Sequence, residues 1–214
     1  MQKAPNDSYE FAESLLANQH CYLVRNCLDL SEQTQVFQEI LERSKNTDNS
    51  ANRACMNPTP KTIIFDGNQS TIKFRGSNLF GDLIVSKANA IILQNKQGWI
   101  RDNHNVADIR MSVGVIRYPV PDGHFPLHVD HCNDNSCVYL LSLGCTANFV
   151  VQEGQSEKLT LSLKSGDVLV FDPSTKAAIT HGVQSIVAEY PAGCPEDFQQ
   201  YRFGVQCRVK LNNS

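Results

Sequence analysis

The sequence lacks the features that mark a secreted, membrane-spanning or zinc-ribbon protein. Residues 1–20 are largely polar or acidic and contain no apolar run long enough for a signal peptide or a membrane span. The eight cysteines include no Cys-x-x-Cys pair, which argues against a zinc ribbon and a thiol redox motif. We therefore expect a protein of the cytoplasm or nucleus with reduced thiols and no membrane partner.

A strong excess of one charge is also missing. The formal net charge of −3 argues against a surface coated in basic groups for wrapping nucleic acid. Basic side chains are nevertheless concentrated in residues 51–117, which hold nine lysines and arginines against four aspartates. This region either contacts phosphates or is ordinary solvated surface, and the sequence leaves both readings open.

What is present suits one globular domain. The chain has 214 residues, of which 41% are hydrophobic and 19% charged. A globule of this length buries about 70% of the surface that its unfolded chain exposes, so it needs no structural metal for stability. Any metal site should therefore be functional.

Two segments favour helices. Residues 29–45 place apolar side chains at helical spacing, and Asp29 with Glu32 matches a capping box at the start. A second helix is predicted from Asp82 to Gln94, where apolar residues recur without glycine or proline. The Asn- and Ser-rich residues 46–60 between them predict a loop.

From Met111 onward the pattern changes to short β-rich runs separated by turn residues. The runs cover residues 112–120, 137–144, 146–152, 158–163, 167–172 and 201–210. Spacing of about ten residues per strand favours an antiparallel sandwich or jelly roll over alternating strands and helices. We expect a mainly β protein with flanking helices.

His128 and Asp130 are the first candidate metal ligands. They lie two residues apart, so both side chains project from the same face of an extended segment. Such a pair is weak evidence alone, but His181 follows a turn-rich stretch and precedes Gly182. Two imidazoles and one carboxylate leave coordination positions open, as non-haem Fe(II) oxygenases require, whereas zinc favours a closed tetrahedron.

The last predicted strand indicates a ligand for this metal. Alternation over residues 201–210 places Arg202, Gly204, Gln206 and Arg208 on one face. If this face is the inner one, two arginines point inward, where a guanidinium is costly unless it pairs with an anion such as a carboxylate. The strand then indicates a dicarboxylate, 2-oxoglutarate; the alternative is a solvent-exposed face with two surface arginines.

Residues 128–208 resemble the AlkB family of Fe(II)/2-oxoglutarate-dependent dioxygenases. The resemblance implies a double-stranded β-helix (jelly roll, cupin-like), with Fe(II), 2-oxoglutarate and O2 as cofactors and co-substrates and ascorbate as the reductant. It rests on His128-x-Asp130, the segment from Ser142-Leu143-Gly144 to Phe149, the strand from Gly166 to Phe171, His181-Gly182, and two arginines six residues apart, Arg202 and Arg208.

The resemblance also assigns roles. By match, the two histidines and the aspartate bind iron, Arg202 grips the distal carboxylate of 2-oxoglutarate, and Arg208 lies near its 1-carboxylate. Tyr118 is similar to a family tyrosine that hydrogen-bonds the co-substrate, with one residue inserted. The chain departs from the family pattern at Ile116, at Cys132, and in the closing motif, where Gly204 and Gln206 replace asparagine and threonine. These departures concern substrate choice.

Four further residues are candidate substrate contacts. Phe171 matches an aromatic position near the family's substrate pocket, and Trp99 lies in the region that matches its nucleotide-recognition lid. Either ring suits stacking on a flipped base, although aromatics in such positions more often pack in a core. His131 and Cys132 follow the metal-binding motif directly and are expected to flank the pocket.

A zinc site is the competing interpretation of this region. Its ligands would come from a group of histidines and cysteines within fourteen residues: His124, His128, His131, Cys132 and Cys137. Two histidines four residues apart share a face only on a helix, and Pro126 opposes a helix there. We interpret His124 as a loop residue.

These observations predict a monomer with one domain, residues 1–214. Residues 1–50 form an N-terminal helical segment, residues 51–117 a substrate-recognition lid and supporting helix, and residues 118–214 the catalytic β core. The resemblance implies oxidative demethylation of N-methylated nucleobases in DNA or RNA. Two alternatives stay open: a protein or small-molecule hydroxylase with the same cofactors, and a binding module on this fold that has lost turnover.

Overall fold

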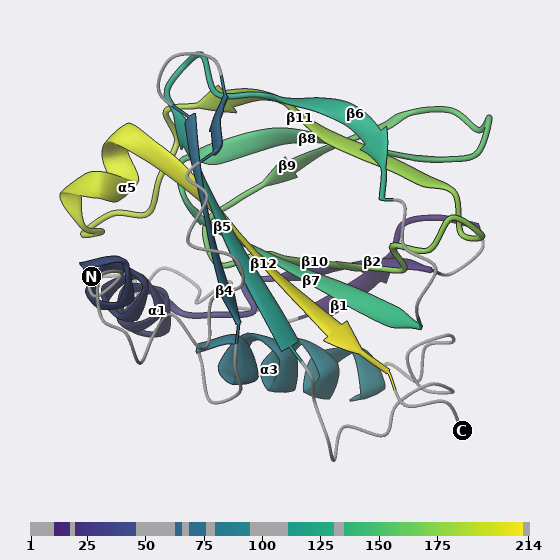
Figure 1. Ribbon diagram of the computed structural model, residues 1–214, viewed down its shortest axis with the longest axis horizontal. Coiled ribbons are helices and arrows are strands. Elements are labelled where there is room, and N and C mark those ends of the chain that lie inside the picture. Colours follow the sequence, from purple (N-terminus) through teal and green to yellow (C-terminus); the bar gives the residue numbers. More distant parts are fainter. Residues whose placement is uncertain are drawn as a thin grey trace, which may run out of the picture.

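The computed structural model describes residues 11–17, 20–45, 63–65, 69–75, 80–94, 111–130 and 135–211. Two antiparallel sheets face each other, and helices cover the outer side of the larger sheet (Figure 1). The strands are β1 (Phe11–Ser14), β2 (Cys21–Arg25), β3 (Ile63–Phe65), β4 (Gln69–Arg75), β5 (Met111–Pro119), β6 (Phe125–Val129), β7 (Ser136–Gly144), β8 (Thr146–Glu153), β9 (Leu159–Leu163), β10 (Val168–Phe171), β11 (Ile179–Val187) and β12 (Tyr201–Lys210). The helices are α1 (Leu30–Lys45), α3 (Phe80–Gln94) and α5 (Glu196–Gln200).

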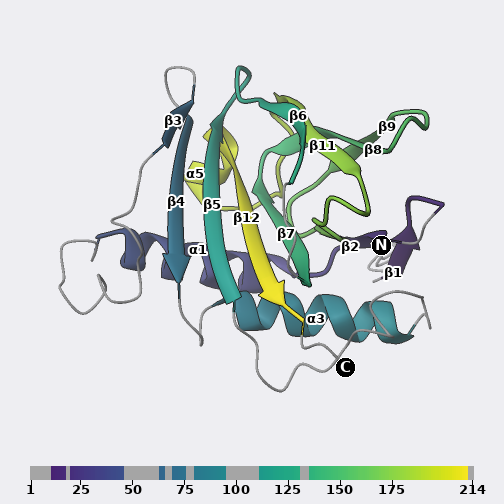
Figure 2. The same cartoon turned by 45° about the vertical axis from the view of Figure 1, so that its right-hand side comes forward.

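The strand order confirms the expected mainly β jelly-roll architecture. The large sheet has eight strands in the order β1-β2-β10-β7-β12-β5-β4-β3, and the small sheet has four in the order β6-β11-β8-β9. Figure 2 shows β4, β5, β12 and β7 side by side, with α1 and α3 beneath them. The space between the two sheets is where β12 and β11 can bring side chains together.

Strand β7 shows how the layers are held. Its side chains alternate between two hydrophobic clusters: Val138 packs between the sheets, whereas Tyr139 and Leu141 pack under the helices. Both faces of β7 are therefore buried, which explains its near-continuous apolar sequence. The buried hydroxyl of Tyr139 donates a 2.7 Å hydrogen bond to Asn89 Oδ1 of α3, which fixes the helix against the sheet.

The large sheet extends further toward the N-terminus than the sequence pattern predicts. Strands β1 and β2 lie in the segment expected to be helical, and β5 begins at Met111, before the expected start of the core at residue 118. Strand β2 is buried on both faces, so its sequence lacks the alternation that marks a half-exposed strand. The predicted lid, residues 51–117, is described only in β3, β4, α3 and the start of β5.

The predicted capping box of α1 is confirmed. The backbone N–H of Glu32 donates to Asp29 Oδ1, and the backbone N–H of Asp29 donates to Glu32 Oε2, each at 2.9 Å. Two amides at the exposed helix start are thereby satisfied reciprocally. Helix α3 also begins close to its predicted start, at Phe80 instead of Asp82.

We expect Asp29→Ala to lower the free energy of unfolding by about 1 kcal/mol, because it removes the acceptor that satisfies the Glu32 amide. Urea denaturation followed by circular dichroism measures this change. Asp122→Ala, in the exposed turn before β6, is the control and should leave the midpoint unchanged. An Asp29→Ala midpoint equal to that of the wild type would contradict the capping role.

Within the described residues, no helix is long and apolar enough to cross a membrane. The six cysteines in this part of the chain are free thiols. Cys55 and Cys132 lie outside the described residues.

Candidate metal and co-substrate site

The two candidate histidines face each other across neighbouring strands. Strands β6 and β11 pair antiparallel with His128 directly opposite His181, and the two ring centroids lie 4.4 Å apart. Gly182 permits this close pairing, because a Cβ there would lie 2.7 Å from the carbonyl oxygen of Phe125. The histidines, 53 positions apart in the sequence, therefore meet through strand register.

Asp130 completes the group. It follows the end of β6, two residues beyond His128, and one ligand atom from each of the three side chains lies within 4.8 Å of the others. The Nε2 atom of His128 lies 3.6 Å from Asp130 Oδ1. Among the described residues this is the one such group of three. Because the three ligands converge from one side, the opposite side of a bound ion remains open.

The backbone fixes which ring nitrogen faces the metal. Nδ1 of His128 lies 3.0 Å from the carbonyl oxygen of Pro126, and Nδ1 of His181 lies 3.3 Å from that of Ile179. A carbonyl oxygen only accepts, so in each neutral ring Nδ1 carries the hydrogen and donates it. The lone pair of each Nε2 is then free for a metal, with the ring orientation set by the carbonyl.

The protonation preferences of His181 and Asp130 suit a bound cation. Burial lowers the pKa of His181 to about 4, which keeps its ring neutral. The neighbouring Asp130 carboxylate raises the pKa of His128, so a metal ion would compete with a proton for Nε2 of this ring. Burial alone would raise the pKa of Asp130, but the neighbouring His128 and the positive charge of Arg208 outweigh it and hold that pKa low. Asp130 is therefore ionised.

Arg208 orients the carboxylate of Asp130. Its Nη2 atom donates to Asp130 Oδ2 at 2.6 Å. One carboxylate oxygen is thus occupied by the guanidinium, and the other, Oδ1, remains on the side of His128. The sequence placed Arg208 beside the co-substrate, and the structure places it on the carboxylate of the metal group.

We expect Arg208→Met to weaken Fe(II) binding by about 10- to 100-fold, the usual effect of removing a partner that orients a metal ligand. Anaerobic titration with Fe(II), followed by competition with a chelator, measures the dissociation constant. Lys210→Met, on the exposed end of the same strand, is the matched control and should bind like the wild type. Wild-type affinity in Arg208→Met would show that Asp130 needs no such partner.

Arg202 is the most unusual buried group of the site. It is 0% exposed, and its Nε and Nη2 atoms have no hydrogen-bond partner in the part of the chain that the structure describes. It lies opposite Tyr118 in the β12–β5 pairing, with its guanidinium carbon 5.0 Å from the centre of the Tyr118 ring. A buried cation without an anionic partner costs several kcal/mol, so this position suits an anion that the described residues do not supply.

Two neighbours shape the surroundings of Arg202. A Cβ at Gly204 would lie 2.8 Å from Arg202 Nη1, so the missing side chain leaves the space that the guanidinium occupies. Burial raises the pKa of Tyr118 to about 12, although the nearby arginine opposes this. Tyr118 is therefore a neutral phenol that can donate a hydrogen bond to an anion beside Arg202.

A small cavity of about 50 Å³ joins these groups. It reaches from the metal group to Tyr118 and Gly204, which border Arg202, and its wall is otherwise largely apolar. The lining residues are Ile116, Tyr118, Phe125, His128, Val138, Leu140, Phe149, Phe171, His181, Gly182, Val183, Gly204 and Gln206. The donor set therefore fits a ferrous ion at one end and a carboxylate at the other.

Phe171 belongs to both the core and the cavity wall. It is 1% exposed, and its ring centroid lies 4.6 Å from that of His181. Phe125 lies 4.9 Å from His128 in the same way. The sequence predicted Phe171 near the pocket but missed Phe125 and Phe149, because aromatic residues in β-rich segments usually indicate core packing alone.

The other candidate substrate residues, Trp99, His131 and Cys132, lie outside the described residues. His124 is exposed and its Nδ1 contacts the carbonyl oxygen of Asp122 at 3.0 Å. Cys137 is in the cluster under the helices, on the face of β7 that points away from the cavity. The described part of the chain thus offers no support for the zinc interpretation.

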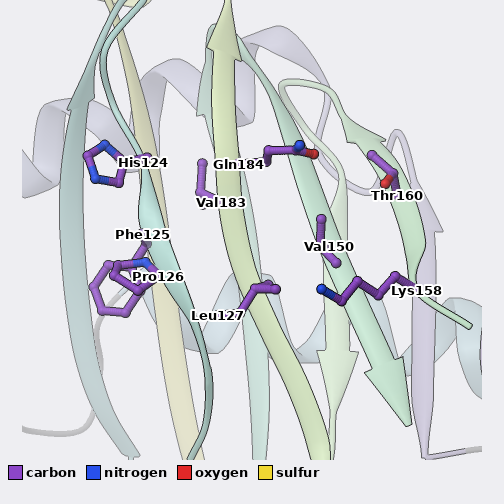
Figure 3. Close-up of a pocket in the computed structure, with 9 residues that line it drawn as sticks. All are labelled: His124, Phe125, Pro126, Leu127, Val150, Lys158, Thr160, Val183 and Gln184. Carbon is purple, nitrogen blue, oxygen red and sulfur yellow. The ribbon is translucent and has the colours of Figure 1, made fainter. Parts of the chain in front are cut away.

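A larger cavity, of about 400 Å³, lies along the small sheet, but the described residues that line it include no candidate metal group (Figure 3). It shares only Phe125 and Val183 with the metal cavity. Its remaining lining residues are His124, Pro126, Leu127, Val150, Lys158, Thr160 and Gln184. The side chains that line the smaller cavity, and not its volume, therefore identify it as the candidate active site.

Comparison with known proteins agrees with this geometry. Residues 20–208 match the family model of the 2OG-Fe(II) oxygenase superfamily. No curated protein matches the sequence.

Several solved structures share the fold. The structure of OsALKBH1 has a TM-score of 0.57 at 16% identity, covering 94% of this chain and 100% of that one. A prolyl-4-hydroxylase from Pseudomonas putida has a TM-score of 0.53 at 12% identity, covering 89% and 92%. A prolyl hydroxylase from Trichoplax adhaerens, solved with a peptide fragment of the hypoxia inducible factor oxygen degradation domain, has a TM-score of 0.55 at 13% identity, covering 89% and 83%.

The matched region contains the metal group, the buried arginine and nearly the whole of both sheets. At such low identities the solved structures support the fold alone, whereas the family model covers most of the chain. The protein therefore belongs to the 2OG-Fe(II) oxygenase superfamily.

Proposed function

We propose that the protein is an oxidative demethylase of N-methylated nucleobases in DNA or RNA, acting as a monomer with Fe(II), 2-oxoglutarate and O2. The observation that carries the dioxygenase chemistry is the fully buried guanidinium of Arg202, whose Nε and Nη2 atoms find no partner among the described residues, behind a His-Asp-His group. The substrate assignment draws on the AlkB-like spacing of residues 128–208 and on the fold shared with OsALKBH1, an AlkB homologue by name.

When bound, Fe(II) would activate O2, which is the oxidant: 2-oxoglutarate supplies two electrons and takes up one oxygen as it becomes succinate and CO2, and the C–H bond supplies the other two and receives the second oxygen. On an N-methyl group the product is an N-hydroxymethyl group, which loses formaldehyde and leaves N–H. The protein's own part is to bind and orient.

Each part of the site has a task in this scheme. His128, Asp130 and His181 would hold the iron from one side, which leaves the other side for co-substrate and O2. Arg202 would neutralise the distal carboxylate, with Tyr118 donating a hydrogen bond beside it. The apolar wall would exclude water and strengthen these contacts.

Mass spectrometry tests the substrate directly. Methylated DNA and RNA oligonucleotides are incubated with the protein, Fe(II), 2-oxoglutarate and ascorbate as reductant. We expect loss of one methyl group from a nucleobase, with release of formaldehyde and succinate in equal amounts. If the basic residues of 51–117 contact phosphates, turnover also falls as salt rises. Succinate formation without demethylation of any oligonucleotide would contradict the proposed substrate.

Peptide hydroxylation is the second candidate, because two of the similar structures are prolyl hydroxylases. It requires the same cofactors and the same site. A panel of proline-containing peptides in the same assay separates the two functions: hydroxylation adds one oxygen atom to the peptide and releases no formaldehyde.

A further inference from the structure

Gln206 is a polar residue that lines the cavity, and neither the metal group nor the Arg202 site uses it. It lies on β12, half-buried, and lines the cavity together with His128 and His181. Its carboxamide forms no hydrogen bond within the described part of the chain. A carboxamide that faces a largely apolar cavity is an available donor and acceptor for a ligand.

The arginines on either side of Gln206 are already committed in different ways. The guanidinium of Arg202 lies at Gly204, as the 2.8 Å approach of its Nη1 to a Cβ there shows. Arg208 gives Nη2 to Asp130 at 2.6 Å. On β12, Gln206 lies between Arg202 and Arg208, the partner of Asp130. Its side chain therefore remains available to face a ligand.

Strand spacing sets which part of the ligand Gln206 would meet. Two residues along a strand cover about 7 Å. This step, from Gly204 to Gln206, is close to the length of an extended five-carbon diacid. A diacid whose distal carboxylate lies on Arg202 would therefore bring its other carboxylate near Gln206, beside the metal group formed by Asp130 and the histidines.

We propose that Gln206 donates a hydrogen bond from Nε2 to the 1-carboxylate of 2-oxoglutarate, and that Arg208 is a positioning residue for Asp130 and not the ligand of that carboxylate. This inference rests on the dioxygenase part of the proposed function and is independent of the nucleobase substrate. It reassigns the 1-carboxylate contact from the arginine, where the family resemblance puts it, to a glutamine that departs from the family pattern.

Anaerobic calorimetry tests the assignment on protein loaded with Fe(II). Gln206→Met keeps the size of the side chain and removes its hydrogen-bonding atoms, and we expect the dissociation constant of 2-oxoglutarate to rise about tenfold or more, as for a lost hydrogen bond to a charged group. Gln206→Glu should weaken binding further, because its carboxylate repels that of the ligand. Gln184→Met, exposed on β11, is the matched control and should bind like the wild type.

The metal-binding readout separates ligand contact from structural damage. Gln206→Met should bind Fe(II) with wild-type affinity, whereas Arg208→Met should lose Fe(II) affinity. Thermal melting monitors folding; if Gln206→Met is unstable, Gln206→Asn, which keeps a carboxamide but shortens its reach, replaces it and should also weaken 2-oxoglutarate binding.

Equal affinity for 2-oxoglutarate in the wild type and the folded Gln206 variants would overturn the inference. Failure of the wild type itself to bind 2-oxoglutarate would overturn the co-substrate assignment and the inference with it. A wild type that binds 2-oxoglutarate more tightly than Gln206→Met, yet demethylates no oligonucleotide, would support the inference while refuting the nucleobase substrate.

Discussion

Arg202→Met should raise the dissociation constant of 2-oxoglutarate by about 100-fold or more. The guanidinium is fully buried, and removal of one partner of a buried charge pair weakens binding by about 2–5 kcal/mol. Calorimetric titration of the Fe(II)-loaded protein measures the change. Iron affinity should be unaffected, because Arg202 belongs to no part of the metal group.

Arg117→Met is the matched control. Arg117 lies on the neighbouring strand β5, is exposed, and packs its guanidinium over the ring of Tyr201 at 4.8 Å. We expect 2-oxoglutarate binding like that of the wild type. Equal losses of 2-oxoglutarate affinity in Arg117→Met and Arg202→Met would mean that the overall positive charge of the protein attracts the diacid, and not the buried guanidinium of Arg202.

The same Arg202→Met substitution should stabilise the protein in the absence of ligand by about 1–3 kcal/mol. An apolar side chain of similar length removes a buried charge whose Nε and Nη2 atoms have no hydrogen-bond partner among the residues described. Urea denaturation without 2-oxoglutarate measures this gain. A variant that is more stable but binds 2-oxoglutarate more weakly would identify Arg202 as a binding group. A loss of both stability and affinity would indicate a structural role.

Asp130→Ala should abolish turnover. Loss of an orienting partner already costs about 10- to 100-fold in metal affinity, so loss of a direct ligand should cost more than about 100-fold. It also leaves the guanidinium of Arg208 without its 2.6 Å partner beside the metal. Fe(II) content after desalting and conversion of 2-oxoglutarate to succinate are the two measurements.

Asp122→Ala provides the control, since this carboxylate is exposed in the turn before β6 and lies outside the metal group. It should retain iron and turnover. An Asp130→Ala protein that bound Fe(II) and turned over like the wild type would remove Asp130 from the ligand set.

Local patterns in the sequence predicted the parts of the fold that depend on neighbouring residues. The reciprocal bonds of Asp29 and Glu32 follow from a three-residue spacing, and the common face of Arg202 and Arg208 follows from strand alternation. The common face of His128 and Asp130 has the same origin. These relations hold whatever the rest of the chain does.

Relations between distant segments could not be predicted in this way. The contact of Arg208 with Asp130 joins residues 78 positions apart, and it exists because β12 passes close to the end of β6. Strand β2 pairs with β10, but both of its faces are buried, so its sequence lacks the alternation of apolar and polar residues that would predict a strand. The structure was needed to show which side chain each buried group meets.

The most direct test is a crystal structure of the protein with Fe(II) and 2-oxoglutarate. The crystals are grown anaerobically, and anomalous diffraction at the iron edge locates the metal. We predict one iron peak coordinated by Nε2 of His128, Nε2 of His181 and Oδ1 of Asp130, with the distal carboxylate of the diacid on Arg202. Iron bound elsewhere, or a diacid that leaves the Arg202 guanidinium unpaired, would contradict it.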